Sequence, residues 1–336
     1  MERYARQIVF NRIGEEGQRK LLNSRIAIIG MGALGTVSAN NLCRSGVGFL
    51  RIVDRDYVEL SNLQRQLLYN EDDVKQSLPK AAAAFGHLSK VNSEITIEPV
   101  ITDVNSSNIE SLINDVDLVL DATDNWETRI LLNEACHALK IPWIYCAALG
   151  STGMTMNMFP EEDSPCLRCI VPEASSAQTE TCSTFGVLNM ITNAVASIQT
   201  AEAIKFLIGS ASIRRELLTV DIWDNHITSL KMKKNLECPV CVHGNYEYYG
   251  KLTGSYTSDL CGNNSIQVVP AALLNVDFQI LANKLKPAGS VHYNRFTLVF
   301  TDGKYEITLF KDGRAIIKNA IDGNNAKSIY SEYLGL

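Results

Sequence analysis

The 336-residue chain has neither an excess of basic residues nor a long uninterrupted hydrophobic run. Its 31 Lys and Arg are outnumbered by 37 Asp and Glu, and the resulting net charge of −6 argues against nonspecific nucleic-acid binding. The longest apolar stretch, residues 186–208, contains Asn, Gln, Glu and Lys, so we expect a buried or interface helix and no membrane span. We also find no internal repeats.

The N-terminal segment lacks the apolar core of a secretory signal peptide. Its first ten residues, MERYARQIVF, carry charges where such a core would lie. We therefore expect a cytoplasmic protein, in which disulfides are rare. The content of 46% hydrophobic and 20% charged residues is ordinary for a globular protein, and the length suffices for one large domain plus a smaller one.

The most informative stretch is residues 25–56. An apolar run stops at the sequence GMGALG, a G-x-G-x-x-G motif, and a helical pattern and a second apolar run ending at Asp54 follow. This is the order of a nucleotide-binding strand–turn–helix–strand unit. In such a unit Gly30 permits the tight turn, Gly32 lets phosphate approach the backbone, and Gly35 lets the helix pack on the strand. Asp54 is placed to accept hydrogen bonds from ribose. The alternative is a glycine-rich structural turn, and the motif alone does not specify the nucleotide.

Polar and charged residues follow the ends of the predicted strands. The segment SNLQRQ comes after the second strand, Lys80 opens an Ala-rich helix after Pro79, and Asp124 follows the apolar run 117–121. Ligands of open α/β sheets bind beyond the carboxyl ends of the strands, so Asp124 could hold the Mg²⁺ of a triphosphate. The alternatives are that Asp124 or Asn125 caps the next helix, and that Lys80 is a solvated surface charge.

The cysteines form two C-x-x-C pairs, Cys166 with Cys169 and Cys238 with Cys241. Two such pairs predict a tetrahedral Cys₄ zinc site. The long gap between them predicts a structural clamp that joins distant segments. A redox dithiol and reduced buried cysteines remain alternatives. Cys182 lies near the start of the long helix, where a lowered pKa and greater reactivity are common.

The alternation of strands and helices predicts the architecture. We expect an α/β domain over residues 1–245, with a doubly wound, mostly parallel Rossmann-like sheet and the zinc clamp. Residues 246–258 are polar and predict a linker. Residues 259–336 predict a small α+β C-terminal appendix, which carries no catalytic constellation.

Taken together, these motifs resemble the ThiF/MoeB/HesA family, bacterial relatives of the ubiquitin-activating enzymes. The resemblance covers residues 1–245 in unbroken order. It is carried by RY-x-RQ at residues 3–7, GMGALG at 30–35, DRD at 54–56, SNLQRQ at 61–66, PK at 79–80, DATDN at 121–125, both C-x-x-C pairs, and TC-x₃-G at 181–186.

The resemblance implies an adenylyltransferase that uses ATP and Mg²⁺. Its substrate would be the C-terminal glycine of a small β-grasp sulfur-carrier protein that ends in Gly-Gly, in thiamin or molybdenum-cofactor biosynthesis. The glycine carboxylate would attack the α-phosphate of ATP and give an acyl-adenylate and pyrophosphate. Which carrier is used, which sulfur donor follows, and what the appendix does stay open.

The resemblance also implies roles for single residues. Asp54 would hold the ribose, Asn62 a phosphate or the ribose, and Asp124 the Mg²⁺. Arg65 and Lys80 would lie against the phosphates.

Two further roles concern residues outside this set. Arg6 would reach the ATP of a neighbouring subunit, which implies a homodimer. A cysteine at the position of Cys182 takes part in sulfur transfer in ThiF-like members, whereas MoeB-like members use theirs only for structure or not at all, so the role of Cys182 stays open.

Three other functions compete with this interpretation. An NAD-dependent oxidoreductase would need only the glycine motif, but it has no need of the triphosphate set Arg65, Lys80 and Asp124. A non-catalytic scaffold that binds a carrier or a nucleotide would not need this charged set intact. A relative that adenylates a peptide terminus in a natural-product pathway would share the chemistry and differ in the acceptor groove.

Overall fold

The structure, a computed structural model, describes the chain except residues 161–162, 172–184, 252–255, 261–264, 271–273 and 336. The described residues form two compact units. The first comprises residues 1–75, 79–171 and 185–251, and the second comprises residues 76–78 and the described part of 252–336.

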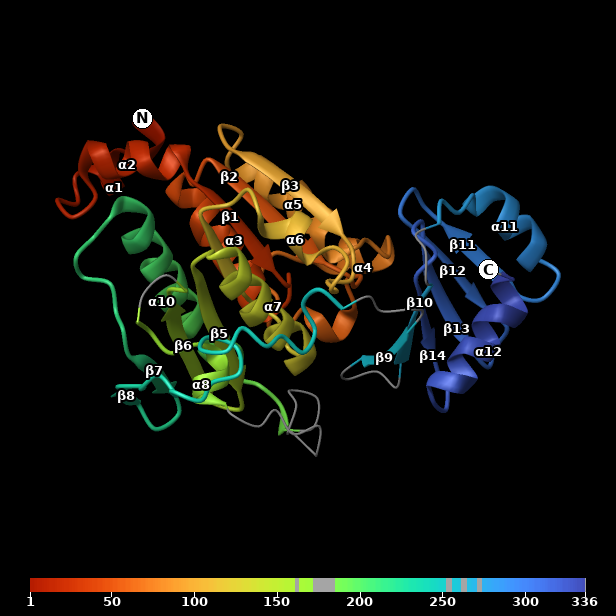
Figure 1. Cartoon of the computed structure of the whole chain (residues 1–336). Helices are drawn as coiled ribbons and strands as arrows, with labels where there is room; N and C mark the ends of the chain where they lie inside the picture. The colour runs from red at the N-terminus through yellow and green to blue at the C-terminus, as the bar shows by residue number, and fades with distance from the viewer. Residues whose placement is uncertain (161–162, 172–184, 252–255, 261–264, 271–273, 336) are drawn as a thin grey trace. The chain divides into compact units, whose positions relative to one another are not determined.

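The first unit is built on an eight-stranded sheet with the strand order β3-β2-β1-β4-β5-β6-β7-β8 (Figure 1). The strands are β1 (Arg25–Ile29), β2 (Phe49–Asp54), β3 (Thr96–Ile101), β4 (Leu118–Asp121), β5 (Trp143–Leu149), β6 (Thr152–Met158), β7 (Leu217–Asp221) and β8 (His226–Leu230). The first five strands in the chain pair in parallel, and β5 to β8 pair antiparallel. The predicted doubly wound, mostly parallel sheet is confirmed.

Helices cover both faces of this sheet. One face carries α3 (Ala33–Ser45), α5 (Lys80–Val91) and α10 (Asn189–Ile208), and the other carries α6 (Ile109–Ile113) and α7 (Trp126–Leu139). Shorter helical segments are η1 (Glu2–Tyr4), α1 (Ala5–Ile8), α2 (Gly14–Asn23), η2 (Leu60–Asn62), α4 (Glu71–Lys75) and α8 (Leu167–Ile170). None of the helices in the described part of the chain combines the length and apolarity needed to cross a bilayer.

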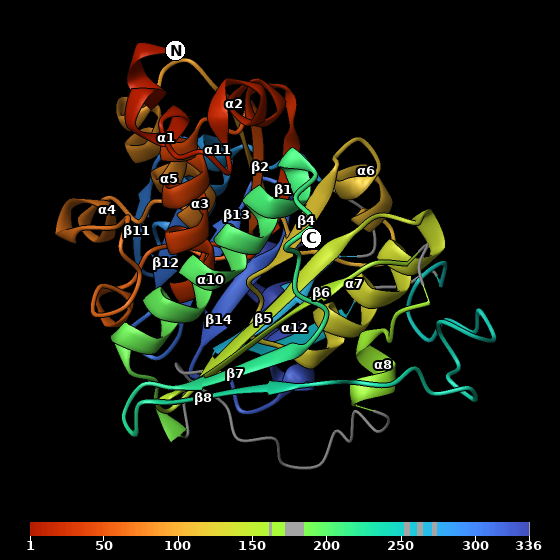
Figure 2. The same cartoon turned by 90° about the vertical axis from the view of Figure 1, so that its left-hand side faces the viewer.

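The long helix α10 lies across β5 and β6, as Figure 2 shows. Much of it is buried, in agreement with the expected buried or interface helix. Gly153 of β6 makes this close approach possible, since a Cβ there would lie 2.8 Å from Val195 of the helix. The buried Gln199 side chain donates hydrogen bonds to the carbonyls of Asp121 and Ile144, both at 2.9 Å. These bonds hold α10 to the last residue of β4 and to the start of β5.

The segment that follows the last strand of the first sheet packs against α7. The buried carboxylate of Glu134 accepts hydrogen bonds from the backbone N–H groups of residues 247–249, at 2.8 to 3.0 Å. Three such bonds order the chain at this point. Residues 246–251, which the composition assigned to a linker, therefore lie in the first unit.

The second unit is an antiparallel sheet with two helices. Its strand order is β11-β12-β13-β14-β10-β9, with β9 (Tyr256–Leu260), β10 (Ser265–Val269), β11 (Ser290–Tyr293), β12 (Thr297–Thr301), β13 (Glu306–Phe310) and β14 (Ala315–Lys318). The helices α11 (Phe278–Leu285) and α12 (Gly323–Leu334) pack on it around Phe300 and Ile317. The turn between β13 and β14 contains Gly313 with φ +87°, a conformation that glycine adopts readily.

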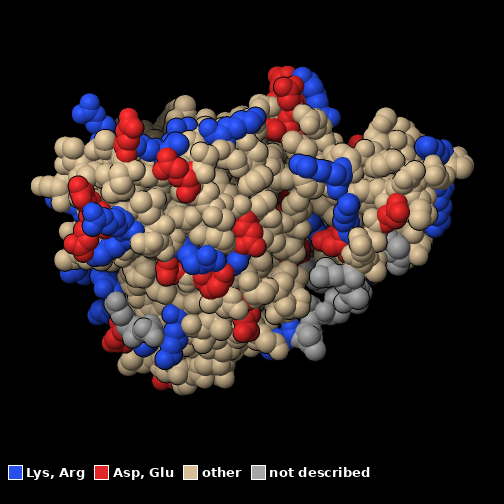
Figure 3. Space-filling model, turned by 90° about the horizontal axis from the view of Figure 1, so that it is seen from above, with Lys and Arg blue, Asp and Glu red and all other residues tan. Residues whose placement is uncertain are grey.

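Charges of both signs are interspersed over the molecular surface that Figure 3 shows. Helix α2 illustrates how such charges pair, with Lys20 3.1 Å from Glu16 and Arg19 3.2 Å from Glu15. Exposed pairs of this kind contribute little to stability. The fold therefore depends mainly on the buried apolar side chains of the two units.

Gly35 sets the spacing between α3 and β1, which gives a testable prediction. A Cβ at Gly35 would overlap the carbonyl oxygen of Gly30, whereas one at Gly86 in α5 meets nothing within 4 Å. We expect Gly35→Ala to lower the free energy of unfolding by about 1–3 kcal/mol, because the backbone must shift. Gly86→Ala should be neutral or stabilise by up to about 1 kcal/mol. Denaturant titration measures both, and equal midpoints for the two variants would contradict the packing role.

Candidate active site

The glycine motif forms the turn between β1 and α3. Gly30 adopts φ +97°, a conformation that side-chain-bearing residues rarely adopt, and Gly32 is the residue that precedes the first turn of α3. A Cβ at Gly32 would meet only the Gln66 side-chain nitrogen, at 3.9 Å. No side chain caps the N-terminus of α3, so its first N–H groups are available to an anion.

Asp54, at the end of β2, lies against this turn. One carboxylate oxygen accepts a 2.6 Å hydrogen bond from the backbone N–H of Met31, and the other accepts one of 2.7 Å from the N–H of Asp56. Burial raises the pKa of Asp54, although the nearby Lys80 charge opposes the shift. The structure thus ties the second strand directly to the glycine turn.

Lys80 is the first residue of α5 and is 7% exposed, which excludes a solvated surface charge. Its ammonium group lies 3.0 Å from the carboxylate of Asp56, and its backbone N–H donates to the Asp56 carbonyl at 2.9 Å. Burial alone would lower the pKa of Lys80, but Asp56 and Asp54 raise it above its ordinary value. The group therefore stays charged beside the turn. Asp56 belongs to the DRD motif, but nothing in the sequence pairs it with Lys80.

The SNLQRQ segment contains a short helical turn, η2, after β2. The side-chain oxygen of Asn62 accepts a 3.1 Å hydrogen bond from the N–H of Glu59, so this buried amide caps the turn. Arg65 is half-buried and donates to the carbonyl of Ser61 at 2.9 Å. Both side chains thus have local partners here, and a nucleotide role for them stays a prediction.

Two aspartates near the end of β4, Asp121 and Asp124, differ in their surroundings. Asp121 is fully buried, and its carboxylate contacts the guanidinium of Arg129 at 3.1 Å and accepts hydrogen bonds from Thr123 at 2.7 and 2.9 Å. Burial raises the pKa of Asp121, and Arg129 opposes this. Arg129 also donates to the carbonyls of Thr123 and Cys146. This network fixes the chain just before Asp124.

Asp124 itself is exposed, and Asn125 is the residue that caps α7, through a 2.9 Å hydrogen bond from the N–H of Thr128. Asp124 is close enough to Lys80 to help raise the pKa of that group, and it acts in the same way on Arg55. Arg55, which the sequence did not single out, pairs with Asp103 at 2.8 Å. The structure therefore brings Lys80 and Asp124 to the same region.

Arg6 is not part of this cluster in its own chain. The adjacent Gln7 donates to the carbonyl of Ser45, at the last residue of α3, at 2.9 Å. The glycine turn precedes the first residue of the same helix. Thirteen residues at 1.5 Å each separate the two ends by about 20 Å. Arg6 is therefore anchored at the opposite end of α3 from the turn.

The two C-x-x-C pairs converge as predicted. All four sulfur atoms lie within 4.8 Å of one another, and the closest pairs are 3.4 Å (Cys169 to Cys241) and 3.6 Å (Cys166 to Cys238). A tetrahedral zinc with Zn–S bonds of about 2.3 Å needs sulfur atoms about 3.8 Å apart. The donor set and spacing fit such an ion, which would join the chain after β6 to the chain after β8.

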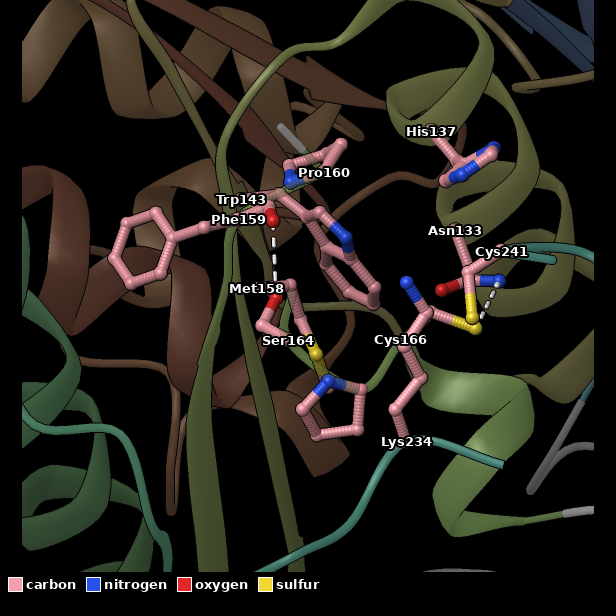
Figure 4. Close-up of a pocket in the computed structure, with 11 residues that line it drawn as sticks. Asn133, His137, Trp143, Met158, Phe159, Pro160, Ser164, Cys166, Lys234 and Cys241 are labelled. Atoms are coloured by element: carbon pink, nitrogen blue, oxygen red, sulfur yellow. Dashed lines mark hydrogen bonds between the residues drawn. The ribbon is translucent and has the colours of Figure 1, made fainter. Parts of the chain in front are cut away.

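Figure 4 shows a small cavity beside the cysteine cluster, lined by His137, Trp143 and Lys234 among others. The side-chain amide of Asn133 donates to the sulfur of Cys166 at 3.8 Å. The cavity encloses about 20 Å³, room for about one water molecule and far too little for a nucleotide. Among the described residues, this cavity leaves no room for a substrate beside the four cysteines.

The remaining cysteines divide into two groups. Cys43, Cys136 and Cys146 are buried, and burial raises the pKa of each thiol, to about 11 for Cys43. Cys182 lies outside the described residues, as does Cys261.

Comparison with known proteins agrees with this geometry. Residues 4–240 match the ThiF family. The chain is 39% identical over 336 residues to the sulfur carrier protein ThiS adenylyltransferase of Bacillus subtilis (strain 168), and the match covers 99% of each. It is 35% identical over 242 residues to the molybdopterin-synthase adenylyltransferase of Escherichia coli (strain K12), covering 72% of this chain and 96% of that protein.

Among solved structures, E. coli MccB with ATP has a similar fold, with a TM-score of 0.62 at 23% identity over 72% of this chain and 74% of that one. This likeness concerns the fold alone. The family match, which spans most of the chain, and the two relatives above go further. The chain belongs to the ThiF family.

Proposed function

We propose that the chain is an ATP-dependent adenylyltransferase that activates the C-terminal glycine of a small ubiquitin-like sulfur-carrier protein. The observation that carries the proposal is the gathering of Lys80, Asp54 and Asp124 around the glycine turn in a chain of the ThiF family. The adenylyltransferase names of the relatives support it. An NAD-dependent oxidoreductase, which the glycine motif alone would allow, has no such support.

In the reaction, a carboxylate oxygen of the carrier forms a bond to the α-phosphorus of ATP. The bond from this phosphorus to the oxygen that bridges to the β-phosphate breaks, and pyrophosphate leaves with the electron pair. No proton transfer is needed, so the protein contributes alignment and charge neutralisation. Lys80 and Arg65 would face the phosphates and balance the charge that builds on pyrophosphate. Asp124 would hold Mg²⁺, which neutralises the phosphate oxygens when bound.

The cation at Lys80 is prepared for this task before ATP binds. Its buried ammonium is kept charged by Asp56, 3.0 Å away, and by Asp54. Phosphate oxygens that enter beside the turn offer the same ammonium a second anionic partner. Asp54, at the turn, would accept hydrogen bonds from the ribose, and Asn62 would orient a phosphate or the ribose.

We favour a ThiS-type carrier, which would place the enzyme in thiamin biosynthesis. The relative of that name matches 99% of this chain, the second unit included. The molybdopterin-synthase adenylyltransferase covers 72% of it. A role for Cys182 in sulfur transfer to the adenylated carrier belongs to a later step, and Cys182→Ser should leave the adenylation itself intact.

The enzyme would act as a homodimer. Arg6 lies about 20 Å from the glycine turn of its own chain, at the far end of α3, and an arginine side chain is much shorter than that. If Arg6 assists ATP binding, as the resemblance implies, it must do so in a second copy of the chain. The partner site would then be incomplete without it.

We also propose that Cys166, Cys169, Cys238 and Cys241 hold a structural Zn²⁺. Four thiolates leave no open coordination position, so the ion would take no part in the chemistry. Reduced thiols also suit the cytoplasmic location expected from the sequence.

Carrier-dependent ATP–pyrophosphate exchange tests the function. Lys80→Ala and Arg65→Ala should each lower the exchange rate by about 10²–10³-fold, because each removes charge that stabilises the leaving pyrophosphate. Lys90→Ala, which removes an exposed lysine from the same helix as Lys80, is the control and should exchange normally. Thermal melting checks that all variants fold. Near-normal exchange by Lys80→Ala would remove the proposed phosphate site.

Subunit mixing tests the shared site. Arg6→Ala and Lys80→Ala should each be inactive alone, but a mixed dimer holds one intact site, so a fully exchanged mixture should recover about a quarter of wild-type exchange. Arg65→Ala mixed with Lys80→Ala is the control. Arg65 and Lys80 each act in the site of their own chain. Each site of that mixed dimer therefore carries one of the two changes, and neither is intact. Recovery in the control alone, or in neither mixture, would count against the contribution of Arg6 across the interface.

Metal analysis tests the clamp, with an expected content of about one zinc per chain. Cys169→Ser should lose the metal and melt at a lower temperature. Cys43→Ala changes a buried cysteine outside the cluster and should keep the metal. A stable wild-type protein without zinc would contradict this assignment.

A further inference from the structure

Tyr69 joins the glycine turn to the start of α5. It follows the SNLQRQ segment and is 7% exposed. Its hydroxyl oxygen lies 2.8 Å from the carbonyl oxygen of Met31 and 3.2 Å from that of Lys80, and the single hydroxyl hydrogen can be donated to either. One buried side chain thus contacts both elements that are proposed to bind the phosphates.

The contact with Met31 bears on the direction of a neighbouring N–H group. In a trans peptide the carbonyl of one residue and the N–H of the next point in opposite directions. A hydroxyl that holds the Met31 carbonyl therefore also fixes the Gly32 N–H, which points away from Tyr69. The Met31 N–H, in the preceding peptide, is held separately by Asp54 at 2.6 Å.

Glycine makes this restraint necessary. Rotation of the Met31–Gly32 peptide changes φ of Gly32, and glycine accepts nearly any φ at little cost. A rotated peptide would turn a carbonyl oxygen toward an incoming phosphate and the N–H away from it. Gly32 itself is not crowded on its Cα, since an added Cβ would meet only the Gln66 side-chain nitrogen, at 3.9 Å.

We propose that Tyr69 is a positioning residue for the triphosphate. Its hydroxyl holds the Met31–Gly32 peptide with the Gly32 N–H available to phosphate. It also fixes the position of the turn relative to Lys80. The inference rests on the proposed function, in which ATP binds at this turn.

The surroundings of Tyr69 suit a permanent donor. Burial, and to a smaller extent Asp54, Asp73 and Asp56, raise the pKa of Tyr69 well above its ordinary value. The hydroxyl therefore keeps its hydrogen over the whole physiological range. A phenylalanine would preserve the packing of the ring and remove only the donor.

The test compares the binding of ATP–Mg²⁺ and of adenosine by calorimetry. Tyr69→Phe should weaken ATP binding roughly tenfold, the effect of about one hydrogen bond, and change adenosine binding less than about twofold, because adenosine has no phosphates. Tyr330→Phe is the matched control. It removes another buried tyrosine hydroxyl, which donates to the Gly313 carbonyl at 2.6 Å in the second unit, and should change neither affinity.

Three results would overturn the proposal or its basis. Unchanged ATP affinity in Tyr69→Phe, with a fall in melting temperature like that of Tyr330→Phe, would make the hydroxyl merely structural. Equal losses for ATP and adenosine would indicate a general distortion of the site and not a placed N–H. Lys80→Ala is measured alongside, and full ATP affinity in that variant would instead refute the proposed function.

Discussion

A buried cation held between carboxylates, beside a glycine turn, is the constraint on which the site depends. Moving the Lys80 ammonium out of water is costly unless opposite charges accompany it. Asp56, at 3.0 Å, and Asp54 supply them. Asp54 is the last residue of β2, and Asp56 lies two residues further along the chain. Because Asp54 also accepts the Met31 N–H, the same carboxylate connects the charge and the turn. The groups that we propose to face the phosphates are therefore already in place without a nucleotide, as electrostatic catalysis requires.

The rest of the first unit keeps these groups in place. The ion pair between Asp121 and Arg129 ties the end of β4 to α7, and Gln199 of α10 donates to the Asp121 carbonyl from the other face of the sheet. Helices on both faces thus converge on one strand end. The cysteine cluster joins the segment after β6 to the segment after β8. The contacts of Asp121 with Thr123 and Arg129 fix the chain just before Asp124.

The sequence predicted those parts of the fold that follow from local rules. The glycine spacing predicts a tight turn, and the alternation of strands and helices predicts the doubly wound sheet. The two C-x-x-C pairs predict that their four sulfur atoms lie together. It did not predict the Asp56 partner of Lys80, the donor role of Tyr69, or the capping by Asn62. Each of these depends on which side chains the tertiary fold brings together. The antiparallel pairing of β5 to β8 was not predicted either, because hydrophobic periodicity does not encode strand direction.

A crystal structure of the chain with ATP, Mg²⁺ and its carrier is the most direct measurement of the central claim. We expect the phosphates to lie over residues 30–35, with the Lys80 ammonium within about 3 Å of a phosphate oxygen and Asp124 beside the Mg²⁺. Phosphates bound elsewhere, with Lys80 still paired only to Asp56, would contradict it.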